Sequence, residues 1–302
     1  METNCTQNFF KRREQMISTI KTHSPKTLAE AYAILQQERE GVKVLAGGTD
    51  LMVTLNARVE QHPAYLNIWN LAELRGIDES KDMIRIGALT TYTQIIRSAL
   101  MQQQAPILIE AAKLVGATQI QNRGTLGGNI VNASPAGDTL PVLAVLDAVL
   151  EVGSAHGTRQ IAFNEFYTGY RKTKLAPEEL LLAIYLPKSA KNDWQYFRKV
   201  GTRQAQAISK IVLALRAQKS ADHEINSISI AYGSVAPTVI RTPQTEALLS
   251  GKRLTEALIE QAGQTAMQEV RPITDVRSTE DYRRLVSGNI LKRALYEFRQ
   301  SA

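Results

Sequence analysis

Cysteine is nearly missing from this chain of 302 residues, which contains only Cys5. A disulfide within the chain is therefore excluded, and the scarcity of thiols fits a reducing compartment such as the cytoplasm. An iron–sulfur cluster held by this chain alone is excluded as well, because such a cluster needs about four thiolates.

Histidine is scarce too, with four residues in polar or turn-like contexts. There is no His-x-x-x-His pair and no dense carboxylate cluster, so the sequence predicts no metal site. The Gly-x-Ser-x-Gly elbow, the phosphate loop ending in Gly-Lys-Ser/Thr and the Gly-x-Gly-x-x-Gly pattern are all absent. We therefore expect no catalytic side chain, and favour a protein whose chemistry belongs to a bound cofactor.

Long apolar runs are missing, and no charged segment leads into an apolar one at the start, so neither membrane insertion nor a secretion signal is predicted. The net charge of +7 arises from 36 Lys and Arg against 29 Asp and Glu. These basic residues are scattered, which favours a solvated surface over a nucleic-acid stripe. A basic face could still dock an acidic partner subunit.

Residues 1–20 are polar and show no clear hydrophobic period, which predicts an extension. Beyond them, hydrophobic periodicity predicts helices and strands, and a polar linker is expected near 189–193. Thr27, with Glu30 three residues later, has capping-box spacing and predicts a helix ending at Gly41. The expected strands are 42–46, 65–68, 84–88, 130–131, 150–152, 160–163, 180–186, 194–197, 208–215 and 225–232. The expected helices cover 91–96, 107–115, 141–146, 255–269 and 280–298.

Two glycine loops lie at residues 45–50 (Leu-Ala-Gly-Gly-Thr-Asp) and 124–129 (Gly-Thr-Leu-Gly-Gly-Asn). Glycine allows close backbone approach and positive φ, and free N–H groups in such turns form a concave anion trap suited to a diphosphate. A plain tight turn is the alternative for the first loop. The second is more specific, because Thr125 and Asn129 add side-chain donors. Together they predict one large phosphate-bearing cofactor, gripped from both sides.

Residues 44–51 and 122–130 closely resemble the two FAD signatures of the flavin subunits of molybdenum hydroxylases. That family includes xanthine dehydrogenase, nicotinate dehydrogenase, carbon monoxide dehydrogenase and aldehyde oxidoreductase. Further agreement lies at 84–91, 133–138, 179–181, 197–203 and 281–284, so the likeness spans about residues 20 to 298 in the family's order. One departure is Gln121, which stands where the family usually has an arginine; Arg123 follows two residues later.

The resemblance implies an α+β fold with a polar N-terminal extension at residues 1–20. Residues 21–190 would form an FAD-binding domain of the p-cresol-methylhydroxylase (PCMH) type, made of two subdomains. Residues 194–298 would form a C-terminal α+β domain of the CO dehydrogenase flavoprotein type, an antiparallel sheet backed by helices.

The same resemblance, carried over position by position, implies the residues that bind FAD. Residues 44–51 and 125–129 would hold the diphosphate, Asp138 would contact the cofactor's polar chain, and Val115 and Leu181 would touch it by packing or main chain. Lys199 would lie near the flavin ring, where a cation favours the anionic reduced form of the flavin. From its local sequence alone, the alternative is an ordinary lysine at the edge of a strand. The full set is Val44, Leu45, Ala46, Gly47, Gly48, Thr49, Asp50, Leu51, Val115, Thr125, Leu126, Gly127, Gly128, Asn129, Asp138, Leu181 and Lys199.

In function, the resemblance implies an FAD-containing oxidoreductase subunit of a heteromeric cytoplasmic complex. Electrons would run from a molybdenum-cofactor subunit, through two-iron–two-sulfur clusters on another subunit, to this FAD and on to NAD or another acceptor. The single cysteine agrees, because the clusters must lie on another polypeptide. Two alternatives stay open: a stand-alone FAD-dependent reductase or oxidase, and a basic nucleic-acid-binding protein, although no helix-turn-helix, zinc or aromatic-platform signal is present.

Overall fold

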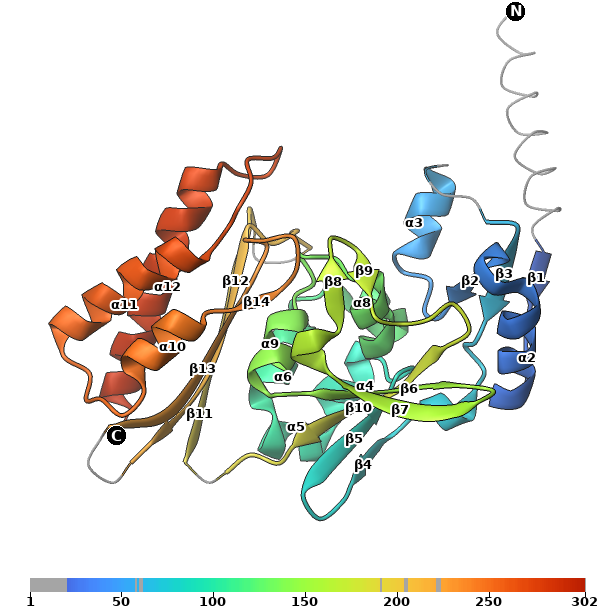
Figure 1. Cartoon of the computed structure of the whole chain (residues 1–302), viewed down its shortest axis with the longest axis horizontal. Coiled ribbons are helices and arrows are strands. Elements are labelled where there is room, and N and C mark those ends of the chain that lie inside the picture. Colours follow the sequence, from blue (N-terminus) through green and yellow to red (C-terminus); the bar gives the residue numbers. More distant parts are fainter. Residues whose placement is uncertain are drawn as a thin grey trace, which may run out of the picture.

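The computed structural model describes residues 21–57, 59, 62–190, 192–203, 206–220 and 224–301. The extension predicted at residues 1–20, with Cys5, lies outside the described residues. Three larger sheets follow one another along the long axis of the molecule, beside a small two-stranded sheet, and the helices α10 to α12 cover the C-terminal sheet at the far end (Figure 1).

The N-terminal sheet is small and parallel, with strands β1 (Lys21–His23), β3 (Ala64–Asn67) and β2 (Val42–Leu45) in that order. Helix α2 (Leu28–Glu38) and the short η1 (Arg39–Gly41) join β1 to β2. Thr27 caps α2 as predicted, because its side chain accepts from the N–H of Glu30. The first glycine loop follows β2 and leads into helix α3 (Leu51–Asn56).

The middle sheet has five antiparallel strands in the order β4-β5-β10-β6-β7. Their bounds are β4 (Ile77–Glu79), β5 (Met83–Gly87), β6 (Val149–Ser154), β7 (Gly157–Ala162) and β10 (Leu180–Pro187). Between β5 and β6 come the helices α4 (Tyr92–Arg97), α5 (Ala99–Gln104), α6 (Pro106–Lys113), α7 (Thr118–Arg123), α8 (Leu126–Asn132) and α9 (Leu140–Val145). The remaining short elements are η2 (Ala72–Leu74), η3 (Phe163–Glu165), β8 (Tyr167–Gly169) and β9 (Lys172–Thr173). The predicted hairpin is confirmed as β6 and β7.

One expected strand is wrong. Residues 130–131 belong to helix α8, which begins after Thr125, whose side chain accepts from the N–H of Gly128. Because this cap begins the helix at Leu126, residues 130–131 lie inside it, and Ile130 is fully buried. The local apolar pair that suggested a strand is therefore helical.

The C-terminal sheet is antiparallel in the order β11 (Asp193–Val200), β12 (Ile211–Lys219), β13 (Ile225–Gly233) and β14 (Ile240–Arg241). Helices α10 (Pro243–Leu249), α11 (Glu256–Glu269) and α12 (Glu280–Gln300) complete this part. The predicted α+β fold with an antiparallel C-terminal sheet is thereby confirmed. Helix α12 buries Ile290, Leu295 and Phe298, whereas Tyr282 and Leu285 near its start are 41% and 56% exposed.

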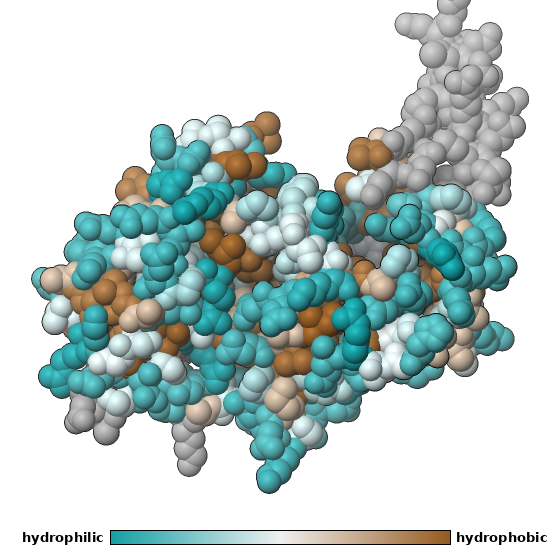
Figure 2. Space-filling view, in the orientation of Figure 1, coloured by the Kyte–Doolittle hydropathy of each residue, from teal (hydrophilic) through white to brown (hydrophobic). Residues whose placement is uncertain are grey.

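Apolar side chains of the described residues gather in three clusters, and one face of the C-terminal sheet is buried in the cluster of the middle sheet. In Figure 2 the visible face is largely hydrophilic, with hydrophobic atoms in small separate groups. Within the described residues, no helix combines the length and apolar character needed to cross a membrane. The same part of the chain offers no group of three or more His, Cys, Asp or Glu side chains that could hold a metal ion.

Candidate functional site

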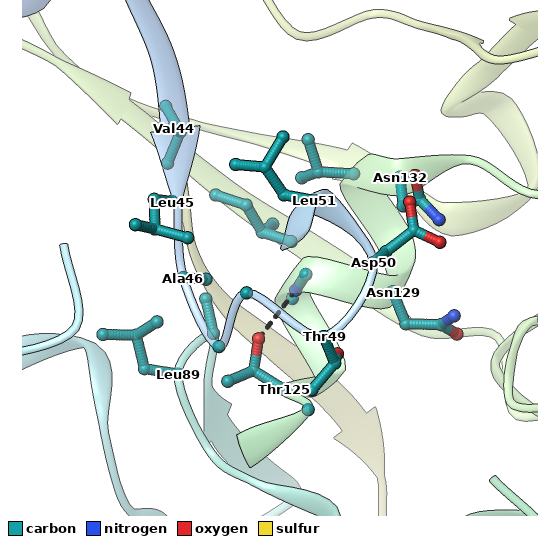
Figure 3. Close-up of a pocket in the computed structure, with 18 of the residues that line it drawn as sticks. Val44, Leu45, Ala46, Thr49, Asp50, Leu51, Leu89, Thr125, Asn129 and Asn132 are labelled. Atoms are coloured by element: carbon teal, nitrogen blue, oxygen red, sulfur yellow. Dashed lines mark hydrogen bonds between the residues drawn. The ribbon is translucent and has the colours of Figure 1, made fainter. Parts of the chain in front are cut away.

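The two glycine loops line a single cleft, although about 75 residues separate them in the sequence. The cleft has a volume of about 460 Å³, within the usual size of small-ligand sites. Residues from β2, the loop after it and helix α8 converge there, as Figure 3 shows. All but three of the residues predicted to bind the cofactor line this cleft; the exceptions are Leu126, Asp138 and Lys199.

Glycine is required where the loops touch other backbone. A Cβ added at Gly47 would lie 1.8 Å from the carbonyl oxygen of Arg123, and one at Gly127 would lie 2.6 Å from that of Ala88. Gly48 has a φ of +78°, in the left-handed region that glycine occupies without strain. The first loop therefore packs directly on the end of α7, and any side chain at position 47 would push the two apart.

The first loop also presents unpaired backbone donors. Within the described chain, the N–H groups of Gly47, Gly48, Thr49 and Asp50 make no hydrogen bond to protein. The loop closes on itself through the N–H of Met52, which donates to the carbonyl of Gly48 at 3.0 Å. Consecutive free N–H groups around a left-handed glycine form a nest for an anion. This donor set fits the diphosphate of a dinucleotide cofactor.

The second loop differs from the backbone cradle that the sequence suggests. The N–H groups of Leu126 and Gly127 donate to the carbonyls of Thr90 and Ala88, at 3.1 and 2.9 Å. The N–H of Gly128 donates to the Thr125 hydroxyl at 3.0 Å, the bond drawn in Figure 3. The first N–H groups of a helix have no partner within the helix, and here Thr90, Ala88 and the cap Thr125 accept from them. At Gly127 and Gly128 the loop gives the cleft a backbone surface without side chains, flanked by Thr125 and Asn129.

Gly128 forms the centre of that surface. A Cβ there would lie 2.8 Å from the Thr125 hydroxyl oxygen and 3.9 Å from the Cβ of Ala46, in the space between the loops. Beside it, Asn129 also lines the cleft, and its Oδ1 accepts from the Thr139 hydroxyl at 2.7 Å. That bond orients the Asn129 amide, whose amino group is left as a side-chain donor.

The three predicted residues outside the cleft are buried. Leu126 is fully buried in the middle core. The Nζ of Lys199 lies 2.7 Å from Oδ2 of Asp138 and 3.0 Å from the carbonyl oxygen of Leu114. Burial raises the pKa of Asp138 to about 6, and the charge of Lys199 opposes that rise. Lys199 is thus a buried ion-pair partner rather than an exposed strand-edge lysine, and the cofactor contacts of this pair stay predictions.

Several residues at the cleft were not predicted from the sequence. Tyr92 and Arg171 line it, and Arg171 donates to Oδ1 of Asn132 at 3.2 Å. No local motif marks them, because the fold alone brings them to the loops. Gln121, the departure from the family pattern, donates to the carbonyls of Lys113 and Val115 at 3.0 and 3.2 Å. These hydrogen bonds hold the backbone at Val115, which lines the cleft. A neutral amide therefore makes these contacts where the family usually has a charged arginine.

Comparison with known proteins assigns most of the chain to two family models. The family described as the FAD binding domain in molybdopterin dehydrogenase matches residues 18–189, and the CO dehydrogenase flavoprotein C-terminal domain matches residues 195–298. The carbon monoxide dehydrogenase medium chain of Hydrogenophaga pseudoflava is 31% identical over 90% of this chain and 94% of its own length. The xanthine dehydrogenase FAD-binding subunit of Escherichia coli O157:H7 is 32% identical over 91% of this chain and 94% of its own.

A solved structure agrees with this assignment. Carbon monoxide dehydrogenase from Hydrogenophaga pseudoflava, in a form that lacks the Mo-pyranopterin moiety of its cofactor, contains a chain that matches with a TM-score of 0.89 and 32% identity. The match covers 92% of this chain and 96% of that one. The cleft with its unpaired backbone donors, the two matching domains and the full-length relatives lead to one conclusion. The chain belongs to the FAD-binding medium subunits of the molybdenum hydroxylase family, a group of flavin-containing oxidoreductase subunits.

Proposed function

We propose that this chain is the electron-transfer subunit of a multi-subunit molybdenum hydroxylase, and that its FAD passes electrons from iron–sulfur clusters of a partner subunit to NAD or another acceptor. When bound, FAD supplies the redox chemistry, since a flavin takes up and releases electrons. The protein's part is to bind the cofactor, orient it and shield it from water.

The observation that carries the proposal is the row of unpaired N–H groups at Gly47, Gly48, Thr49 and Asp50, in a cleft that the glycines of α8 also line. In this proposal they hold the diphosphate, Asn129 adds a side-chain donor, and Val115 and Leu181 pack against the cofactor. Asp138 and Lys199 would act from the neighbouring buried ion pair, on the cofactor's polar chain and near the flavin ring.

The cleft supports a binding role rather than acid–base catalysis. Among the residues that the structure describes, none that lines the cleft is a histidine or a cysteine. Glu179, which lines it, is held in an ion pair with Arg159 at 2.7 Å. Hydroxylation of a substrate would therefore take place on a partner subunit, which would carry the molybdenum cofactor.

Partners are supported by the relatives and by the sequence. The relatives are named as the medium chain of carbon monoxide dehydrogenase and the FAD-binding subunit of xanthine dehydrogenase. This chain has one cysteine, so the two-iron–two-sulfur clusters would belong to another subunit. The proposed complex contains a molybdenum-cofactor subunit, an iron–sulfur subunit and this chain.

Affinity purification of the tagged chain from its native host, with metal and flavin analysis, tests the proposal. We expect about one FAD per chain, with molybdenum and iron in the co-eluting complex. The isolated recombinant chain should bind FAD and contain no iron. A flavin-loaded chain that elutes alone from native extract, without either metal, would favour a stand-alone reductase or oxidase instead.

A further inference from the structure

Trp69 lies next to the first glycine loop and contacts two arginines. The N–H of the preceding residue, Ile68, donates to the carbonyl of Leu45 at 3.0 Å, which ties this segment to the start of the loop. The Cζ atoms of Arg75 and Arg123 lie 4.4 and 3.7 Å from the centroid of the Trp69 ring. Both distances are well within the range of a cation–π contact.

Each arginine connects the indole to the cleft. Arg75 donates to the carbonyls of Trp69 and Leu89, at 2.5 and 3.2 Å, and Leu89 lines the cleft. Arg123 is the residue whose carbonyl oxygen abuts Gly47, where no side chain would fit. Its side chain stacks on Trp69 while its backbone supports the first loop. The Trp69 indole thus lies between the segment that is bonded to the first loop and Arg123, which directly precedes the second loop.

The two guanidinium charges have no acidic partner among the described residues. Arg75 donates only to carbonyl groups, and Arg123 forms no ion pair in that part of the chain. Burial, and to a smaller extent the charge of Arg123, lower the pKa of Arg75. Two neighbouring positive charges without a carboxylate are unfavourable alone, and an anion held nearby would offset that repulsion.

We propose that Trp69 is a positioning residue of the flavin cleft, which holds Arg75 and Arg123 behind the first glycine loop, so that the two loops meet and two positive charges without a carboxylate partner lie beside the proposed diphosphate site. This inference rests on the proposed role of the first loop as the diphosphate site. It assigns a function in cofactor binding to Trp69 and Arg75, which lie outside both signatures, and to the side chain of Arg123, which lies within the second.

Titration of the apoprotein with FAD, followed by flavin fluorescence at several salt concentrations, tests the inference. Trp69→Leu removes the stack and should raise the FAD dissociation constant on the order of tenfold, while Trp69→Phe, which keeps an aromatic face, should stay within about threefold. Arg123→Gln should weaken binding similarly and flatten its salt dependence. Arg123→Lys should keep the salt dependence, because the charge is retained.

The other tryptophan provides the matched control. Trp194 contacts Tyr196 and Phe298 at ring-centroid distances of 5.6 and 5.2 Å, in the C-terminal core. Trp194→Leu should lower the melting temperature and leave the FAD dissociation constant unchanged. A folded Trp69→Leu protein that binds FAD like the parent, or an Arg123→Gln protein with unchanged affinity and salt dependence, would overturn the inference. Failure of the parent chain itself to bind FAD would instead contradict the proposed function.

Discussion

At the scale of single residues, Gly47 is the most constrained position of the cleft. Replacement by alanine would place a Cβ 1.8 Å from the backbone oxygen of Arg123, which cannot rotate away. The loop and the end of α7 would have to separate. We expect Gly47→Ala to lower the free energy of unfolding by about 1–3 kcal/mol and to reduce FAD content. Urea unfolding and the flavin absorbance of the purified protein measure the two effects.

Gly41→Ala is the matched control for that substitution. A Cβ at Gly41 would meet only the Glu38 carboxylate, at 3.9 Å, and the backbone there has no positive φ. Its free energy of unfolding should change by no more than about 0.5 kcal/mol, with normal flavin content. If Gly47→Ala behaved the same way, the close contact between loop and helix would not be required for binding.

The ion pair of Asp138 and Lys199 predicts a pH-dependent stability. The pKa of Asp138 is raised from 3.8 to about 6, chiefly by burial, so the folded state binds this proton more tightly than the unfolded state. The contribution of Asp138 is therefore present below about pH 4 and is lost as the pH rises through about 6. Above that pH the carboxylate is charged and depends on Lys199.

Lys199→Met should consequently cost more at pH 8 than at pH 5. At pH 8 it leaves a buried carboxylate without a cation, a loss of about 3–5 kcal/mol, whereas at pH 5 Asp138 is mostly protonated. Chemical unfolding at the two pH values measures the difference. The double variant Lys199→Met/Asp138→Asn should show almost no such difference. Equal losses at both pH values in the single variant would contradict the ion-pair account.

At the scale of elements, helix α8 depends on its N-cap. Thr125 accepts from the N–H of Gly128, and this bond starts the helix with two glycines in its first turn. Glycine is a poor helix former, so the cap matters more here than in an ordinary helix. We expect Thr125→Val to cost about 1 kcal/mol of stability and also to weaken FAD binding, as measured by unfolding and by flavin titration.

Thr255→Val separates the two effects. Thr255 caps α11 in the same way, by accepting from the N–H of Leu258, but α11 belongs to the C-terminal core. The stability loss should be similar, with unchanged FAD affinity. Loss of flavin in both variants would mean that the effect arises from general destabilisation and not from the cleft.

Much of the element pattern could be predicted because it depends on local chemistry. Thr27 caps α2 in the predicted place, the alternation of apolar residues located β6, and a continuous apolar run that ends at Pro187 located β10. Residues 130–131 were predicted wrongly because a short apolar pair has no period of its own. There the Thr125 cap, and burial of Ile130 against the middle core, decide the conformation.

The features of the site likewise fall into those that could be predicted from the sequence and those that could not. The glycines of the first loop could be recognised from the sequence, because adjacent glycines indicate a tight turn of the backbone, and such a turn depends on local residues. The occupied N–H groups of Leu126 and Gly127 could not, since their acceptors Thr90 and Ala88 come from a distant segment. The contacts of Trp69 with Arg75 and Arg123 likewise depend on tertiary approach, and neither arginine lies in a pattern that would indicate stacking.

At the scale of the whole molecule, the two proposed domains, residues 21–190 and 194–298, share a core. One face of the C-terminal sheet, with Phe197, Val212, Ala214 and Ala231, is buried in the same hydrophobic cluster as helices α6 and α9. The opposite face, alternating with it, packs in the cluster of α11 and α12. Polar bonds cross the boundary too: Arg241 donates to the carbonyl of Ala144 at 3.1 Å.

Because the sheet is covered on both faces, removing either part would expose apolar surface of the other. We therefore expect one cooperative transition in calorimetry of the FAD-loaded chain, with equal calorimetric and van't Hoff enthalpies. A fragment that ends at residue 190 should aggregate or bind a dye for exposed hydrophobic surface, since the helices α6 and α9 lose their cover. Two separate transitions, or a monomeric fragment 21–190 that binds FAD with the affinity of the whole chain, would show that the C-terminal sheet is not needed to complete the flavin domain.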